Sequence, residues 1–181
     1  MNLPQRKLQR LKNYNYSTNG AYFLTICVHN RINLFGNIEN GILTLNNTGK
    51  MIDKIFCELI IKYENMKLIN YIIMPNHMHC IVTIFNSTFL KDIENHSDNK
   101  RNGTRPFPTD EIPTFMRDFK SITTDEYIKM VKSHEVQPFS KHLWQKSYHD
   151  HIIRNEKTYN MIFEYIQTNP LRWKEDIFFY K

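Results

Sequence analysis

The chain has 181 residues, of which 41% are hydrophobic and 13% are aromatic; this composition is typical of a folded domain and excludes a disordered chain. No apolar run is long enough to cross a membrane, so we expect no membrane partner. The formal charge of +6 favours an anionic partner, and nucleic acid is the leading candidate.

Cysteine usage and the N-terminus predict the cellular compartment. Cys27, Cys57 and Cys80 lie far apart and are odd in number, so the sequence indicates neither a disulfide framework nor a CxxC zinc site. The basic segment Met1–Lys12 is not followed by the apolar region of a secretory signal. We therefore expect a cytoplasmic protein.

Hydrophobic periodicity and turn signals predict alternating strands and helices. Asn40-Gly41 is typical of a hairpin, and Pro75-Asn76 separates two β-branched runs that predict a second hairpin. The expected elements are a strand at 21–30, a hairpin of 34–38 and 42–45, a helix from 46 or 47 to about 63, a hairpin of 67–74 and 77–85, a helix at 114–134, an extended segment at 144–153 and a helix at 155–169.

This order predicts the fold class. We expect an α+β domain with an antiparallel, ferredoxin-like sheet and helices packed on one face. The chain 1–181 is expected to form a single domain, interrupted by a flexible loop at about 86–113 that is rich in proline and polar residues. The basic arm 1–18 is either a solvated tail or an arm along a phosphate backbone.

His77-Met78-His79 opens the second strand of the Pro75-Asn76 hairpin. Because strand side chains alternate between faces, both imidazoles project from the same face. A histidine pair is a poor way to fill a core but a good way to hold a divalent metal. From the residues alone, a metal site and two hydrogen-bonded histidines on a half-exposed sheet are both open interpretations.

The last predicted helix carries the second group of candidate residues. Its apolar stripe is expected to face the core and consists of Tyr159, Ile162, Phe163 and Ile166. Tyr165 lies at the boundary of this stripe, and Asn169 follows one turn later on the same side. A tyrosine at such a boundary either packs or reacts, and spacing alone does not choose.

Several sequence blocks together resemble the single-tyrosine HUH transposases, specifically the REP-associated tyrosine transposase group. Met74-Pro75-Asn76-His77-Met78-His79 is similar to the family's histidine–hydrophobe–histidine motif, and Glu164-Tyr165-Ile166-Gln167-Thr168-Asn169 is similar to its helix motif. The remaining blocks span almost the whole chain: 10–16, 20–27, 30–31, 34–36, 119–121, 143–155 and 170–173. The resemblance implies the HUH nuclease fold.

The resemblance also implies a site and a reaction. His77 and His79 would bind Mg²⁺ or Mn²⁺, with Asn169 as the third ligand, directly or through water. Tyr165 would attack single-stranded DNA and form a 5′-phosphotyrosyl link. Three rival tyrosines are Tyr148, Tyr159 and Tyr180, and the i+4 spacing to Asn169 favours Tyr165.

The sequence thus predicts a metal-dependent endonuclease and strand transferase that acts on single-stranded DNA beside a hairpin. The basic residues expected to hold phosphates are Arg10, Lys12, Lys120, Arg154 and Arg172. The alternative function is a non-catalytic DNA-binding protein with the same fold. A metal hydrolase on an unrelated fold is a third class of function. A two-histidine phosphoesterase would need a second His-x-Ser/Thr motif, and the sequence has no matched pair of such motifs. The sequence does not determine whether the protein is a monomer or a homodimer.

Overall fold

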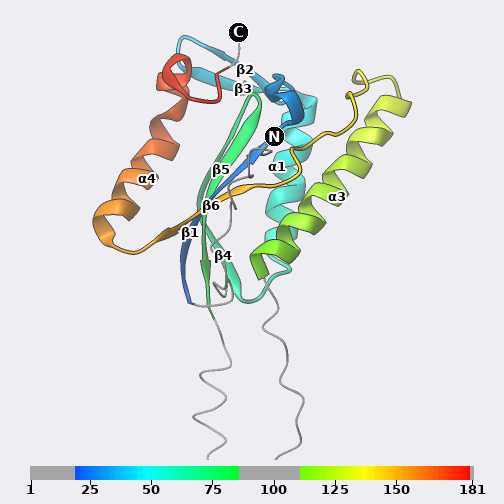
Figure 1. Cartoon of the computed structure of the whole chain (residues 1–181). Coiled ribbons are helices and arrows are strands. Elements are labelled where there is room, and N and C mark those ends of the chain that lie inside the picture. The colour runs from blue at the N-terminus through cyan, green and yellow to red at the C-terminus, as the bar shows by residue number, and fades with distance from the viewer. Residues whose placement is uncertain (1–18, 86–110, 180–181) are drawn as a thin grey trace, which may run out of the picture.

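The computed structural model describes residues 19–85 and 111–179, so the basic arm and most of the expected 86–113 loop lie outside the described residues. The elements are β1 (Gly20–Cys27), the 3-10 helix η1 (His29–Arg31), β2 (Gly36–Glu39), β3 (Ile42–Leu45), α1 (Asn47–Ile60), β4 (Met66–Met74), β5 (His77–Ile84), α3 (Glu111–Lys132), β6 (His149–Ile153), α4 (Glu156–Thr168) and the 3-10 helix η2 (Asn169–Glu175) (Figure 1).

An antiparallel sheet of four strands forms the centre of the fold, in the order β4-β5-β1-β6. In its register, Thr25 of β1 lies opposite His79 of β5, and Cys27 lies opposite His77. β2 and β3 form a separate two-stranded sheet, and their turn contains Gly41 with a φ of +77°, as expected for an Asn-Gly hairpin. The predicted α+β class with an antiparallel sheet is confirmed.

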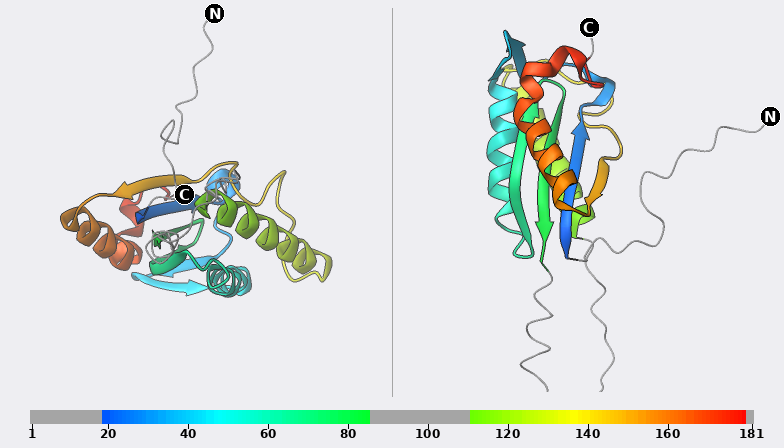
Figure 2. Two further views of the ribbon diagram at one scale, coloured as in Figure 1. Left: turned by 90° about the horizontal axis from the view of Figure 1, so that it is seen from below. Right: turned by 90° about the vertical axis from the view of Figure 1, so that its left-hand side faces the viewer.

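Helices cover both faces of this sheet. The even-numbered residues of β1 and β5 pack into a core with α1 and α3, where aromatic side chains such as Phe56, Phe115 and Phe119 meet. α4 contacts β4, β5 and β6 across the opposite face (Figures 1 and 2). The expectation that all helices pack on one face of the sheet is therefore wrong for α4, which covers the face opposite α1 and α3.

The sequence of β5 gives the reason for this second layer. Nearly all of its residues are buried at both alternating positions, so neither face of the strand is left to solvent. Ile81 and the two histidines on the α4 face are fully covered. A central strand that is apolar on both faces needs packing on both faces.

Side-chain caps fix where two of the helices begin. The Asn46 side chain accepts a hydrogen bond from the Gly49 amide (2.9 Å) at the start of α1, and the Asn155 side chain accepts one from the Thr158 amide (2.8 Å) at the start of α4. α3 begins at Glu111 rather than Thr114, with Pro113 in the first turn, where the missing amide proton costs nothing. The loop expected at 86–113 therefore ends before residue 111.

Some boundaries differ from the expected ones. The segment expected to be extended from Trp144 forms a strand only from His149, although Trp144 makes an isolated bridge with Val28. Within residues 19–85 and 111–179, no helix is long and apolar enough to span a membrane.

Candidate active site

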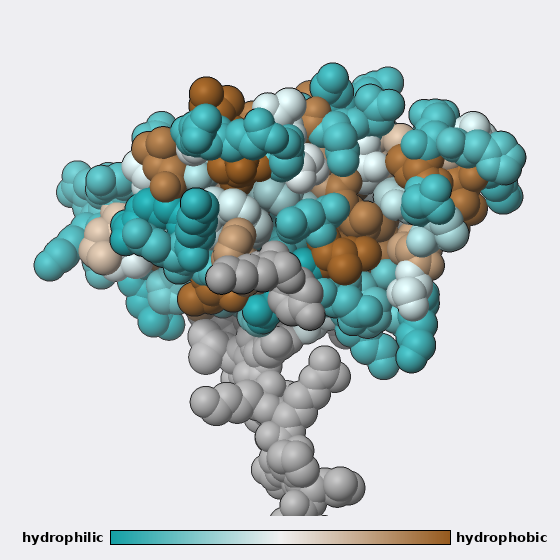
Figure 3. Space-filling model, turned by 90° about the horizontal axis from the view of Figure 1, so that it is seen from above, coloured by the Kyte–Doolittle hydropathy of each residue, from teal (hydrophilic) through white to brown (hydrophobic). Residues whose placement is uncertain are grey.

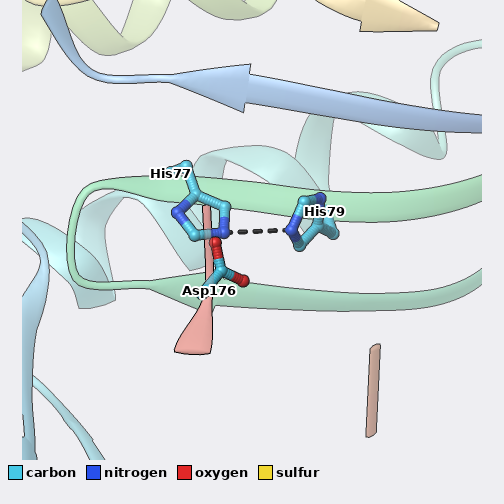
Figure 4. Close-up of side chains that lie close together, drawn as sticks. All are labelled: His77, His79 and Asp176. Atoms are coloured by element: carbon cyan, nitrogen blue, oxygen red, sulfur yellow. Dashed lines mark hydrogen bonds between the residues drawn. The ribbon is translucent and has the colours of Figure 1, made fainter. Parts of the chain in front are cut away.

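The two histidines at the start of β5 point toward each other on the α4 face of the sheet. Their Nε2 atoms lie 3.0 Å apart, and the side chains are 0% and 1% exposed for His77 and His79 (Figure 4). The register with β1 places both beneath α4 rather than in the main aromatic core. The predicted same-face arrangement of the pair is confirmed.

Hydrogen bonds hold both rings from behind. The Asn76 amide nitrogen donates to the carbonyl oxygens of Arg31 (2.9 Å) and Phe178 (2.9 Å), which leaves the Asn76 oxygen as acceptor for His77 Nδ1 (2.8 Å). His79 Nδ1 lies 2.8 Å from the Thr25 hydroxyl. Partners at Nδ1 fix each ring and direct its Nε2 atom into the site, as is usual for metal-binding histidines.

Burial keeps this pair uncharged. Desolvation lowers the pKa of His77 to about 3, and the positive charge of Arg31 adds to the effect. Desolvation also lowers the pKa of His79, with the neighbouring His77 as the second cause. Both imidazoles are therefore neutral near pH 7, which is the protonation state that binds metal ions.

α4 brings Tyr165 to this pair. Its hydroxyl lies 3.2 Å from His79 Nε2 and donates a hydrogen bond to Asp176 Oδ2 (3.0 Å). Phe23 supports the arrangement, since its ring stacks on His79 (5.1 Å between centroids) and meets Tyr165 edge-on (6.2 Å). Burial, and then the charge of Asp176, raise the pKa of Tyr165, so the phenol stays protonated at neutral pH.

Asn169 and Asp176 complete the cluster. Asn169 is buried, and its amide nitrogen donates to Asp176 Oδ2 (3.0 Å). The Oδ1 atom of Asn169 is buried without a hydrogen-bond partner among the described residues. Asp176, together with His77 and His79, forms a group whose ligand atoms all lie within 4.8 Å of one another. Three residues of this cluster were not predicted from sequence, namely Asp176, Asn76 and Thr25.

A cavity of about 310 Å³ opens beside the tyrosine. It is lined by Tyr165, Asn169, Arg172, Glu175, Asp176 and Ile177. The end of the molecule that carries η2 shows polar side chains mixed with separate apolar ones, not one continuous apolar face (Figure 3). Exposed apolar residues of β3, η2 and the adjoining segment are Ile42, Leu171 and Ile177.

The other candidate residues occupy different places. Tyr148 is buried in the core shared with α1 and α3, and Tyr159 stacks on Phe163 within α4, whereas Tyr180 lies outside the described residues. Of the rival tyrosines that the structure describes, none is therefore brought to the histidine pair.

The expected phosphate-binding residues are also dispersed. Arg172 lines the cavity beside Tyr165, and Arg154 is exposed just before α4. Lys120 donates to the carbonyl oxygens of Gln145 (2.8 Å) and Ser147 (3.0 Å), so it holds the segment that leads to β6. Arg10 and Lys12 fall in the arm outside the described residues.

Known structures include one with this fold. A REP-associated tyrosine transposase, solved bound to a REP hairpin, superimposes with a TM-score of 0.57 at 20% identity, over 91% of this chain and 73% of that chain. The chain therefore shares the fold of that structure.

Sequence comparison identifies the family. The family described as "Transposase IS200 like" matches residues 104–169, which include Tyr165 and Asn169. An uncharacterized protein of Haemophilus influenzae is 35% identical over 173 residues, covering 94% of this chain and 91% of that protein. The chain belongs to the IS200-like transposase family, and the resemblance noted in the sequence is confirmed.

Proposed function

We propose that the chain is a metal-dependent endonuclease and strand transferase for single-stranded DNA, with Tyr165 as its nucleophile. The observation that carries this proposal is the 3.2 Å distance between the Tyr165 hydroxyl and His79 Nε2, in a site where His77 Nε2 lies 3.0 Å further on. A phenol beside a paired-imidazole site is an arrangement suited to phosphoryl transfer.

The residues present fit a divalent ion such as Mg²⁺ or Mn²⁺. Two nitrogen ligands at neighbouring vertices of an octahedral ion, each about 2.1 Å from it, lie about 3.0 Å apart. His77 Nε2 and His79 Nε2 have this separation, and the Asn169 oxygen nearby is buried without a hydrogen bond among the described residues. His77, His79 and Asn169 would hold the ion, which when bound supplies charge stabilisation at the scissile phosphate.

The chain's own residues would carry the covalent step. The Tyr165 oxygen loses its proton and forms a bond to phosphorus, while the bond between phosphorus and the 3′ oxygen breaks and the 3′ oxygen gains a proton. The products are a 3′-hydroxyl and a 5′-phosphotyrosine. This exchange conserves the energy of the phosphodiester, so a 3′-hydroxyl can later reverse it and join strands. The Asp176 carboxylate accepts the hydrogen bond of the hydroxyl and so orients its oxygen.

The DNA partner follows from charge and from the structural neighbour. That neighbour is bound to a REP hairpin, and the positive charge of this chain suits a nucleic acid, so we propose hairpin-bearing single strands as the substrate. The proposed phosphate contacts remain Arg10, Lys12, Lys120, Arg154 and Arg172, of which Arg172 lines the cavity beside Tyr165.

A covalent adduct tests this function. A hairpin-bearing single strand labelled at its 3′ end, incubated with the protein and Mn²⁺, should give an SDS-resistant labelled protein band. Tyr165→Phe should abolish the band, while Tyr159→Phe, which removes a hydroxyl from the same helix, should keep it. An adduct that persists in Tyr165→Phe contradicts the nucleophile assignment. Hairpin binding with no adduct in the wild type would favour the non-catalytic DNA-binding protein.

A further inference from the structure

We propose that Asp176, from the segment after η2, supplies the oxygen ligand that completes the metal centre, and that Asn169 is its positioning residue. This inference rests on the metal centre of the proposed function. Within that centre it replaces Asn169, the third ligand of the proposed function, with a carboxylate seven residues further along the chain.

Geometry places the Asp176 carboxylate within reach of both histidines. A carboxylate oxygen of Asp176 lies within 4.8 Å of a ring nitrogen of both His77 and His79, and the carboxylate is directed toward the His77 ring (Figure 4). Among residues 19–85 and 111–179, these three side chains form the one cluster of histidine, cysteine or acidic residues able to share an ion. Asn169 instead turns its amide nitrogen toward Asp176 Oδ2 at 3.0 Å.

A chain of hydrogen bonds through Asn76 and Phe178 couples Asp176 to His77. His77 Nδ1 is bonded to the Asn76 oxygen (2.8 Å), and the Asn76 nitrogen donates to the Phe178 carbonyl (2.9 Å). The Phe178 amide in turn donates to Asp176 Oδ1 (2.7 Å), and the Phe178 ring lies 4.6 Å from that of His77. The same residues therefore fix both the imidazole and the carboxylate, as expected of ligands of one centre.

Ligand chemistry points the same way. A carboxylate is a charged, hard oxygen ligand of the kind that Mg²⁺ and Mn²⁺ prefer, whereas an amide oxygen is neutral. Two neutral imidazoles bring no compensating charge to a buried divalent cation, and Asp176 brings one negative charge. Asn169, one turn after Tyr165, then serves to hold the carboxylate that also contacts the Tyr165 hydroxyl.

Binding of Mn²⁺ alone, without DNA, tests the assignment by titration calorimetry and by loss of the EPR signal of free Mn²⁺. Asp176→Asn and Asp176→Ala should weaken the affinity at least about 100-fold, and Asn169→Ala about 10-fold, as for a residue that orients a ligand. Glu58→Gln is the matched control, because Glu58 is exposed on α1 and pairs with Lys54; the affinity of this variant should be unchanged. Urea unfolding in EDTA shows whether each variant is folded.

The outcomes separate this inference from the proposed function. If His79→Ala abolishes Mn²⁺ binding but Asp176→Asn stays within about threefold of the wild type, Asp176 is not a ligand, and the proposed function stands. A larger loss in Asn169→Ala than in Asp176→Ala also overturns the assignment. If the wild type binds no Mn²⁺, both this inference and the metal dependence of the proposed function fail, whereas the Tyr165 adduct is tested separately.

Discussion

Thr25 shows how a single residue outside the candidate ligand set can control the histidine pair. Its hydroxyl lies 2.8 Å from His79 Nδ1, and it comes from β1, the neighbouring strand. When His79 Nδ1 carries the proton and donates it to this hydroxyl, Nε2 keeps a lone pair for a metal ion. Without the hydroxyl, the opposite tautomer is favoured, with its proton on Nε2.

Thr25→Val should therefore weaken Mn²⁺ affinity by about 10- to 100-fold while leaving the fold intact, since the side chains have similar shape. Titration calorimetry at pH 7 measures the change. Thr124→Val is the matched control: its hydroxyl bonds the Lys120 carbonyl (2.6 Å) within α3, on the other side of the sheet. Equal losses in the two variants would mean that the effect comes from general destabilisation and not from the tautomer of His79.

α4 must be rigid, because it carries Tyr165 and ends at its C-cap Asn169, yet within the helix Ile166 alone is fully buried. Little apolar burial anchors it, so its N-cap contributes a larger share of its stability. The Asn155 side chain makes that cap through the Thr158 amide.

Asn155→Ala should lower the free energy of unfolding by about 1 kcal/mol, whereas Asn155→Asp should be nearly neutral because aspartate caps as well as asparagine does. Urea unfolding followed by circular dichroism measures both. The alanine variant should also lose adduct yield, since fraying of the first turn loosens the nucleophile's helix. A stable Asn155→Ala protein would show that α4 is held by packing alone.

A hydrogen bond between α1 and α3 predicts a pH dependence on the far side of the sheet. The Tyr63 hydroxyl, just after α1, donates to Asp118 Oδ2 of α3 (2.7 Å), and this bond is the main reason why the pKa of Asp118 lies below its usual 3.8. A group with a lowered pKa stabilises the fold above its unfolded pKa, and this contribution is lost as pH falls through the folded pKa.

Tyr63→Phe should therefore reduce the free energy of unfolding at pH 7 by roughly 0.5–1 kcal/mol, a modest value because the carboxylate is partly exposed. The difference from the wild type should shrink below pH 3.8. Urea unfolding at a series of pH values measures it, with Asp118→Asn as the background in which the pH dependence disappears. A difference that stays constant across that range would assign the effect to lost packing of the hydroxyl.

At the scale of the whole molecule, local sequence patterns predicted much of the candidate site but not all of it. Alternation in β5 placed His77 and His79 on one face, and helical spacing placed Asn169 one turn after Tyr165. The sequence did not predict which face of the sheet α4 covers, because an amphipathic helix has the same pattern on either face. Asp176 had no periodic relation to Tyr165, since η2 turns the chain back between them.

The positive charge of the whole molecule can attract DNA in two ways, either as a general field or through basic residues at the cavity beside Tyr165. For single strands, the logarithm of the binding constant falls with the logarithm of salt concentration by about 0.7 per neutralised phosphate. Arg172→Gln and Lys174→Gln each lower the formal charge of +6 by one, and both residues are exposed in η2, but of the two the cavity is lined by Arg172. A general field predicts equal effects of the two substitutions on hairpin binding.

We expect instead that Arg172→Gln makes the slope of the salt dependence shallower by about 0.7 and lowers the yield of the covalent adduct, whereas Lys174→Gln changes neither. Fluorescence anisotropy titrations at several salt concentrations measure the slopes. Equal slopes would place the DNA backbone away from this cavity.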